Sequence, residues 1–150
     1  MDKAVRTGRN ARKLAELDVV IARKARAVIA DMEGQGWQPL IVEAGRDPID
    51  QARKYYSGYS KVLWGFHCAE DEDGNPEALA FDVVDARYQW NVKRYAAKIR
   101  DYIHDLVSSC AAHSLRNGSV WKSFGPWGDF AHCEVTGISL SQAKKGMRPV

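Results

Sequence analysis

The sequence has few cysteines and no long apolar run. Only three of its 150 residues are cysteine (Cys68, Cys110 and Cys133), and no C-x-x-C motif occurs. Three thiols cannot all pair within one chain, so we expect them to be reduced in a protein made in the cytosol. No apolar stretch approaches the length of a membrane span, which predicts that the chain does not insert into a membrane.

The N-terminal stretch also lacks the apolar segment of a secretory signal peptide. It reads MDKAVRTGRNARKLAEL, in which charged residues recur throughout. This pattern predicts that no Sec-type signal is present. If the protein acts outside the cytoplasm, we expect something else to release it.

Composition and charge are those of an ordinary globular protein. Hydrophobic residues make up 45% of the chain, enough for a core, and the net charge is only +3. The basic residues are interleaved with acidic ones and form no recognised nucleic-acid-binding motif, so we expect no nucleic acid partner. The length and the absence of repeats or linkers predict one domain over residues 1–150, and we expect a monomer.

Hydrophobic periodicity predicts helices mixed with a few strands. Apolar residues at helical spacing indicate amphipathic helices over 11–33 and 90–113, and Asp47-Pro48 predicts the start of a short helix over 48–56. Short apolar runs predict strands at 39–45, 78–84, 119–124 and 131–135. Together these elements predict an α+β fold with a small, mainly antiparallel sheet packed against helices.

Two histidines and one carboxylate stand out as a candidate metal site. Asp82 interrupts the apolar run ALAFDVV, where a carboxylate is costly to bury unless it is paired or bound to a metal. His67 and His132 each follow an aromatic, glycine-containing turn. This residue set, drawn from separate segments, is common for a catalytic zinc. We therefore predict one Zn²⁺ held by His67, Asp82 and His132, with Asp129 as general base.

Other interpretations remain open for single residues. Asp82 alone could pair with an arginine, and Asp129 alone could be a turn residue. A structural zinc bound by both His-Cys pairs is disfavoured, because neighbouring residues in an extended segment point to opposite faces. We expect Cys68 and Cys133 to be small core residues and two further histidines to be structural or solvated, namely His104 and His113.

The residues resemble the family of zinc D-alanyl-D-alanine carboxypeptidases and L-alanyl-D-glutamate peptidases, which includes many phage endolysins. The resemblance extends from about residue 14 to 136. It rests on a long first helix, the segment LIVEAGRDPIDQARKYYSGYSKV, a histidine followed by ALAFD, and the element DFAHCE. The family shares its fold with the hedgehog signalling domain, so the resemblance implies that fold here.

The resemblance also implies roles for individual residues. It implies that His67, Asp82 and His132 bind zinc and that Asp129 is the catalytic base. Arg46 matches a family arginine that donates hydrogen bonds to the scissile carbonyl or the oxyanion, a role that suits a fixed guanidinium. We expect Glu134 either to steady a metal ligand or to face solvent.

Two departures from the family pattern concern the first histidine. Fourteen residues separate it from the aspartate, where the family has six, and the extra residues form an acidic segment over 69–77. Such an insert is inexpensive, because doubling the length of a loop costs about 0.6 kcal/mol. We expect a solvated surface loop. Gly65 stands where the family often has serine, which removes a possible hydrogen bond to substrate or ligand.

The resemblance implies a hydrolase that acts on the stem peptides of bacterial peptidoglycan. We expect an L-alanyl-D-glutamate endopeptidase of the endolysin type, made in the host bacterial cytoplasm and active on the cell wall after release. A D-alanyl-D-alanine carboxypeptidase is the alternative within the same chemistry. An inactive cell-wall-binding module is the alternative of another class, although such a module has no need of Asp129.

Overall fold

The computed structural model describes residues 1–60 and 62–150, and it confirms the predicted α+β fold. The strands form one antiparallel sheet in the order β1-β2-β4-β3. The strands are β1 (Pro39–Glu43), β2 (Ala80–Asp85), β3 (Leu115–Gly118) and β4 (Asp129–Val135). The helices are α1 (Lys3–Leu14), α2 (Val19–Gly34), α3 (Pro48–Tyr56), α4 (Val92–Ala112) and α5 (Leu140–Lys144).

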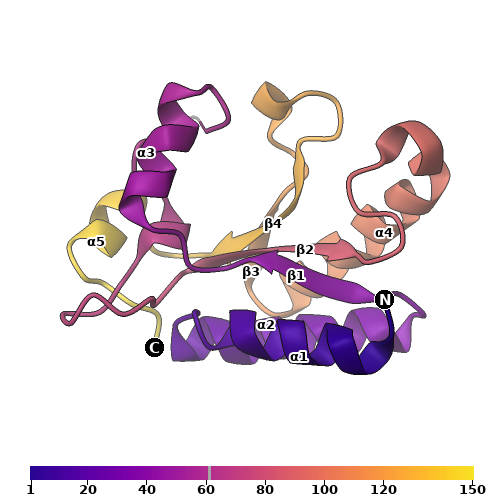
Figure 1. The fold of residues 1–150 in the computed structure, drawn as a ribbon, viewed down its shortest axis with the longest axis horizontal. Helices are drawn as coiled ribbons and strands as arrows, with labels where there is room; N and C mark the ends of the chain where they lie inside the picture. Colours follow the sequence, from indigo (N-terminus) through magenta and orange to yellow (C-terminus); the bar gives the residue numbers. More distant parts are fainter. Residues whose placement is uncertain (61) are drawn as a thin grey trace.

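The elements lie on two sides of the sheet (Figure 1). Helices α1 and α2 run along one side, whereas α3 and the β3–β4 connection stand on the other. Within the described ranges, no helix has the length and apolar character needed to cross a membrane. The second side of the sheet is bordered by segments that are separate in the sequence.

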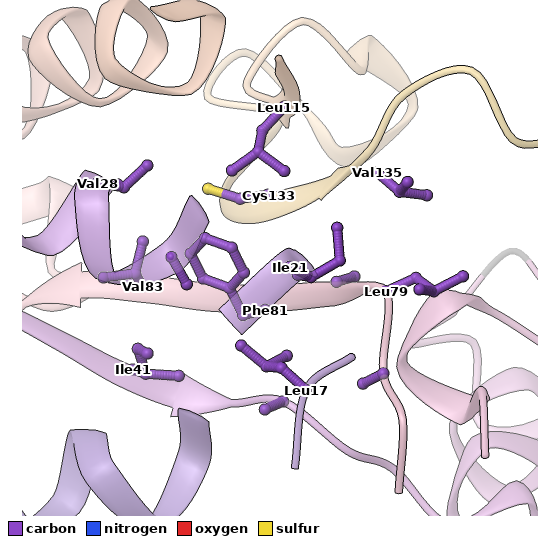
Figure 2. Packing of buried hydrophobic residues seen from close by; sticks show 14 of the residues in the cluster. Leu17, Ile21, Val28, Ile41, Leu79, Phe81, Val83, Leu115, Cys133 and Val135 are labelled. Carbon is purple, nitrogen blue, oxygen red and sulfur yellow. The ribbon is translucent and has the colours of Figure 1, made fainter. Parts of the chain in front are cut away.

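The main core lies between the sheet and helices α2 and α4. Phe81 and Val83 of β2 are fully buried and face this core, together with Ile21 and Val28 of α2 (Figure 2). The hydroxyl of Tyr102 in α4 donates to the carbonyl of Val83 at 3.0 Å, which satisfies a polar group deep in the core. The alternation of β2 therefore turns its apolar set toward the helices and Asp82 toward the opposite side.

The single helix predicted over 11–33 is wrong, because the segment is broken at residues 15–18. Asp18 caps α2, and its Oδ1 accepts hydrogen bonds from the amides of Val20 and Ile21. The backbone before this cap pairs with Ala78, whose amide donates to the carbonyl of Glu16. Aspartate favours a cap over a helix interior, and this tertiary pairing fixes the break.

The other elements agree with the sequence except near the end of the chain. The helix predicted over 48–56 is confirmed, with Asp47 as its cap and Pro48 in its first turn. The strand predicted over 119–124 is wrong: β3 comes earlier, and residues 122–124 form a short 3-10 helix. The connection from β3 to β4 follows, and Gly125 and Gly128 adopt positive φ within it.

Candidate active site

The sheet brings the predicted metal ligands together on its open side. Asp82 of β2 and His132 of β4 are directly paired across the two strands. His67 comes from a separate 3-10 turn, Phe66–Cys68, whose carbonyl at His67 accepts a hydrogen bond from the amide of Arg46. Three segments that are distant in sequence thus converge at one point.

The ligand atoms of these residues form a nearly equilateral triangle. Nε2 of His67 lies 3.3 Å from Nδ1 of His132 and 3.4 Å from Oδ1 of Asp82, and the third side measures 3.2 Å. Ligands at about 2.0–2.1 Å from a tetrahedral zinc stand about 3.3–3.4 Å apart, so the spacing fits such an ion. His67, Asp82 and His132 are the set within the described residues that can hold a metal ion.

Hydrogen bonds on the outer side of each imidazole orient both histidines. Nδ1 of His67 lies 2.7 Å from the carbonyl oxygen of Ala44, and Nε2 of His132 lies 2.9 Å from Oε1 of Glu134. Both partners are acceptors, so these outer nitrogens carry hydrogen. The inner nitrogens, Nε2 of His67 and Nδ1 of His132, therefore have lone pairs to offer to a cation.

The carboxylate of Asp82, the third residue of the cluster, also favours a bound cation. Oδ1 of Asp82 is buried and has no hydrogen-bond partner among the described residues. An unpartnered buried acceptor facing two imidazole nitrogens is unfavourable unless positive charge lies between them. The donor set of two imidazoles and one carboxylate suits a divalent transition metal such as zinc. The residues therefore fit the metal that the sequence predicts.

The electrostatics of the cluster show how strongly it attracts positive charge. Burial opposes ionisation of Asp82, but His67 and His132 outweigh it and hold the pKa of this carboxyl well below its usual range. Burial likewise opposes protonation of His132, but the carboxylates of Asp82 and Glu134 raise its pKa to about 10. A bound cation would replace that proton, because a ligating imidazole nitrogen must be deprotonated.

Asp129 lies beside the cluster without belonging to it. Its Oδ2 is 4.0 Å from Nδ1 of His132, and its side chain is one-third exposed toward solvent. Burial, together with the negative charge of Asp82, raises the pKa of Asp129. The position and the raised pKa are those of a group that can accept a proton near the metal site.

A bulge in β4 places Asp129 and His132 on the same side of the sheet. Strand alternation alone would separate residues three apart onto opposite faces. The pairing of β3 with β4 shifts, however, because Asn117 faces Cys133 whereas the next residue, Gly118, faces Asp129. The intervening residues of β4 bulge out, and this irregularity reverses the alternation.

Buried groups hold this bulge in place. The side-chain amide of Asn117 donates to the carbonyls of Phe130 and His132 at 2.8 and 3.2 Å. A Cβ atom on Gly118 would lie 2.5 Å from the carbonyl oxygen of Asp129, so a larger residue does not fit there. The backbone around Asp129 is therefore fixed by close packing.

Arg46 is held by two partners that the sequence analysis missed. Its Nε donates to Oε1 of Glu43 at 2.6 Å and its Nη1 donates to Oε1 of Gln51 at 2.5 Å, while Nη2 donates to the second oxygen of Glu43. Burial opposes the charge of Arg46, but Glu43 outweighs it and raises the pKa of the guanidinium. The structure thus gives Arg46 a fixed position in the wall of the site.

Glu134 is a buried partner of a metal-site histidine. Besides accepting from His132, it accepts from Nη2 of Arg116 through Oε2 at 2.7 Å, and only 6% of its side chain is exposed. Burial raises the pKa of Glu134, but these two partners outweigh that effect and lower it. The solvent-facing alternative for Glu134 is therefore wrong.

The cluster lines a groove of about 680 Å³. Aromatic residues of the β3–β4 connection and of the segment before α4 line it on one side, and α3 and the loop after it line it on the other. The ring of Trp121 packs against His132 with centroids 5.0 Å apart. Lining aromatic residues are Tyr59, Phe66, Trp90, Trp121 and Phe124.

The remaining sequence candidates lie away from this metal cluster. Cys133 is fully buried on the core side of β4, with its Sγ 3.2 Å from Sγ of Cys110, and Cys68 is also buried. His104 is exposed, and His113 pairs with Asp31 at 2.8 Å. The metal cluster therefore contains no cysteine among the described residues, in agreement with the disfavoured status of the Cys2His2 alternative, and both histidines are structural or solvated, as expected.

The acidic insert over 69–77 forms a small surface hairpin. Its residues 71–76 are exposed, and Oδ1 of Asp71 accepts from the amides of Asp73 and Asn75. Arg148 joins the insert to the C-terminal segment, because it donates to Oε2 of Glu77 and to the carbonyl of Glu70. The insert thus occupies the surface and leaves the spacing of the ligands intact.

The functional residues missed by the sequence analysis share no motif. Glu43 and Gln51 flank Arg46 in sequence. A charged residue at the end of a strand and a glutamine in the next helix could have identified them as partners of Arg46. Asn117 and Arg116 lie in β3, which the sequence did not predict as a strand. Their roles depend on contacts with β4 that only the fold creates.

No protein-family model and no curated protein sequence matches the chain. Among solved structures, the L-Ala D-Glu endopeptidase ChiX from Serratia marcescens matches with a TM-score of 0.62 at 17% sequence identity. The match covers 85% of this chain and 86% of that chain. The chain therefore has the fold of an L-Ala-D-Glu endopeptidase, as the sequence resemblance predicts.

Proposed function

We propose that this protein is a zinc-dependent peptidase that cleaves the L-Ala–D-Glu bond of peptidoglycan stem peptides. The observation that carries the proposal is the buried, unpartnered Oδ1 of Asp82, faced by the inner nitrogens of His67 and His132. The likeness to ChiX, itself an L-Ala D-Glu endopeptidase, supports the choice of substrate.

In this proposal Asp129 moves the proton. His67, Asp82 and His132 would hold a zinc ion, which would act as a Lewis acid that lowers the pKa of water to about 7 and polarises the scissile carbonyl. Asp129 accepts the proton of the attacking water, because its carboxylate lies beside the cluster, with Oδ2 4.0 Å from Nδ1 of His132. It then gives the same proton to the amine that leaves when the C–N bond breaks.

Arg46 stabilises the charge that develops on the carbonyl oxygen. A guanidinium has five N–H groups, and three of those on Arg46 donate to Glu43 and Gln51. The other two can donate to the substrate, because Arg46 lines the groove. A donor fixed before the reaction begins stabilises the transition state without reorganising.

The test is a digest of purified peptidoglycan, with the released ends identified by mass spectrometry. The wild type, the chelated wild type and the chelated protein reloaded with zinc are compared. We expect new N-terminal D-Glu ends with the first and third samples only. His104→Ala, which changes an exposed histidine outside the groove, is the matched control and should behave as the wild type does.

The other outcomes separate the alternatives. Loss of terminal D-Ala without new D-Glu ends would assign the protein as a carboxypeptidase. Binding to the wall without cleavage, by folded and zinc-loaded protein on walls of several chemotypes, would support an inactive binding module and overturn the peptidase proposal.

The endolysin role is part of the same proposal and rests on the sequence resemblance. Expression inside a bacterial host should leave cells intact until the membrane is permeabilised, for example with chloroform, and should then cause rapid lysis. An Asp129→Asn variant expressed to the same level is the control. Permeabilised cells that contain active enzyme but do not lyse would contradict this role.

A further inference from the structure

The charges of the groove favour an anionic substrate once a divalent cation is bound. Among the described residues, four carboxylates and three Lys or Arg side chains line the groove, so the cation changes a net charge of about −1 into about +1. The lining carboxylates are Glu43, Asp82, Asp129 and Glu134, and the lining cations are Arg46, Lys54 and Arg116.

Of the two arginines, Arg116 is the more available to a ligand. The guanidinium of Arg46 is engaged through three nitrogens, and only 12% of its side chain is exposed. Arg116 donates only Nη2 to Oε2 of Glu134, and 54% of its side chain is exposed. One side of the Arg116 guanidinium is thus anchored by a buried carboxylate, and the residue lines the groove with much of its side chain exposed.

The anchor also places Arg116 close to the metal cluster. Glu134 accepts from Nε2 of His132 with one oxygen and from Arg116 with the other. Only the carboxylate of Glu134 therefore separates the guanidinium of Arg116 from the imidazole of His132, which belongs to the cluster. A guanidinium fork matches the two oxygens of a carboxylate, whereas a lysine acts as a point charge.

We propose that Arg116 binds a free carboxylate of the substrate residue next to the scissile bond, so that the protein selects acidic peptides over their amidated forms. The inference rests on the proposed function, for which it names a specificity residue. Arg116 then has two partners, namely the carboxylate of Glu134 within the protein and the carboxylate of the substrate in the groove. Because Glu134 already fixes the side chain, little conformational freedom is lost when substrate binds.

The test uses two synthetic stem peptides that differ only in whether the glutamate carries a free carboxylate or a carboxamide. We expect the wild type to prefer the carboxylate peptide about tenfold in kcat/KM, mainly through a lower KM. This figure already allows for solvent, which weakens the ion pair of a half-exposed arginine. Arg116→Met should remove the preference, and Arg116→Lys should keep part of it. Arg26→Met, on the exposed side of α2, should leave it unchanged.

The design separates selectivity from support of the metal site. If Arg116 merely steadies Glu134 and His132, Arg116→Met lowers both rates by the same factor, and the proposal is overturned. It is also overturned if Lys54→Met, rather than Arg116→Met, removes the preference. If Arg116→Met fails to fold or to bind metal, the test uses the ratio of kcat/KM for the carboxylate peptide to that for the carboxamide peptide in the wild type and in Arg116→Lys. A ratio in Arg116→Lys as high as that of the wild type would then overturn the proposal.

Failure of this inference differs from failure of the proposed function. Equal rates on the two peptides would overturn the role of Arg116 and leave the peptidase activity standing. Absence of cleavage of both peptides and of peptidoglycan by the zinc-loaded wild type would overturn both. Raising the salt concentration should lower the preference as well, because screening weakens attraction between exposed charges.

Discussion

Nε2 of His132 donates to Oε1 of Glu134 at 2.9 Å, and this bond leaves Nδ1 of the same ring facing Asp82. Glu134 thereby determines which nitrogen of His132 can bind a metal. The carboxylate lies two residues after the histidine on β4, so the strand carries both the ligand and the group that orients it.

Replacing Glu134 should therefore weaken metal binding. We expect Glu134→Gln to lower zinc affinity about 10- to 100-fold, because the amide is a weaker acceptor and leaves Arg116 without its anionic partner. Competition with a chromophoric chelator measures the affinity. Glu77→Gln, which changes a carboxylate outside the groove, is the control, and an unchanged affinity for Glu134→Gln would contradict this role.

Replacing Asp129 should separate metal binding from catalysis. We expect Asp129→Asn to keep one zinc per chain and to lower kcat by about 10²- to 10⁴-fold, because an amide cannot accept the proton. Metal content by elemental analysis and cleavage of a synthetic stem peptide are the two measurements. Loss of zinc from the variant would instead assign Asp129 as a ligand.

Metal removal should lower stability as well as activity. Zinc at about 100 times its dissociation constant stabilises the folded state by about 2.7 kcal/mol. For a domain of this size we expect the melting temperature to rise by about 5–10 °C. Thermal unfolding of the chelated and the reloaded protein measures this rise, and the rise should disappear in His67→Ala but persist in His104→Ala.

The bulge of β4 should depend on Asn117. We expect Asn117→Ala to lower the free energy of unfolding by about 1–3 kcal/mol, because the buried carbonyls of Phe130 and His132 lose a donor. Urea denaturation measures the change, with exposed Ser108→Ala as the control. If Asn117→Ala retained full stability and full activity, its support of the bulge would be ruled out.

Stability at low pH should depend on Asp85. Burial opposes ionisation of this carboxyl, but hydrogen bonds from Arg87 and from the amide of Gln38 outweigh it and lower its pKa. The stabilisation is present above the unfolded-state pKa of about 3.9 and is lost as the pH falls through the lower folded-state value.

An Asp85→Asn variant tests this pH dependence. The difference in unfolding free energy between wild type and variant should be constant above about pH 5 and should shrink below about pH 4. Urea denaturation across this range gives the difference at each pH. A difference that stays constant down to pH 2 would mean that folding does not lower the pKa of Asp85.

The sequence by itself determined the fold class and the candidate metal ligands. Asp82 inside an apolar strand and two histidines after aromatic turns are local patterns, and they were enough to name the residues that the structure brings together. The helix over 48–56 was equally readable, because Asp47 and Pro48 are strong local signals for a helix start.

Only the tertiary structure decided how those residues are oriented. The period of a strand would place Asp129 and His132 on opposite faces, and it is the shifted pairing with β3 that puts them on one side. The contacts of Arg116 with Glu134 and of Asn117 with Phe130 likewise join β3 to β4 through side-chain geometry. Such contacts leave no periodic trace in a sequence, because they depend on how segments pack against each other rather than on the conformation of either one.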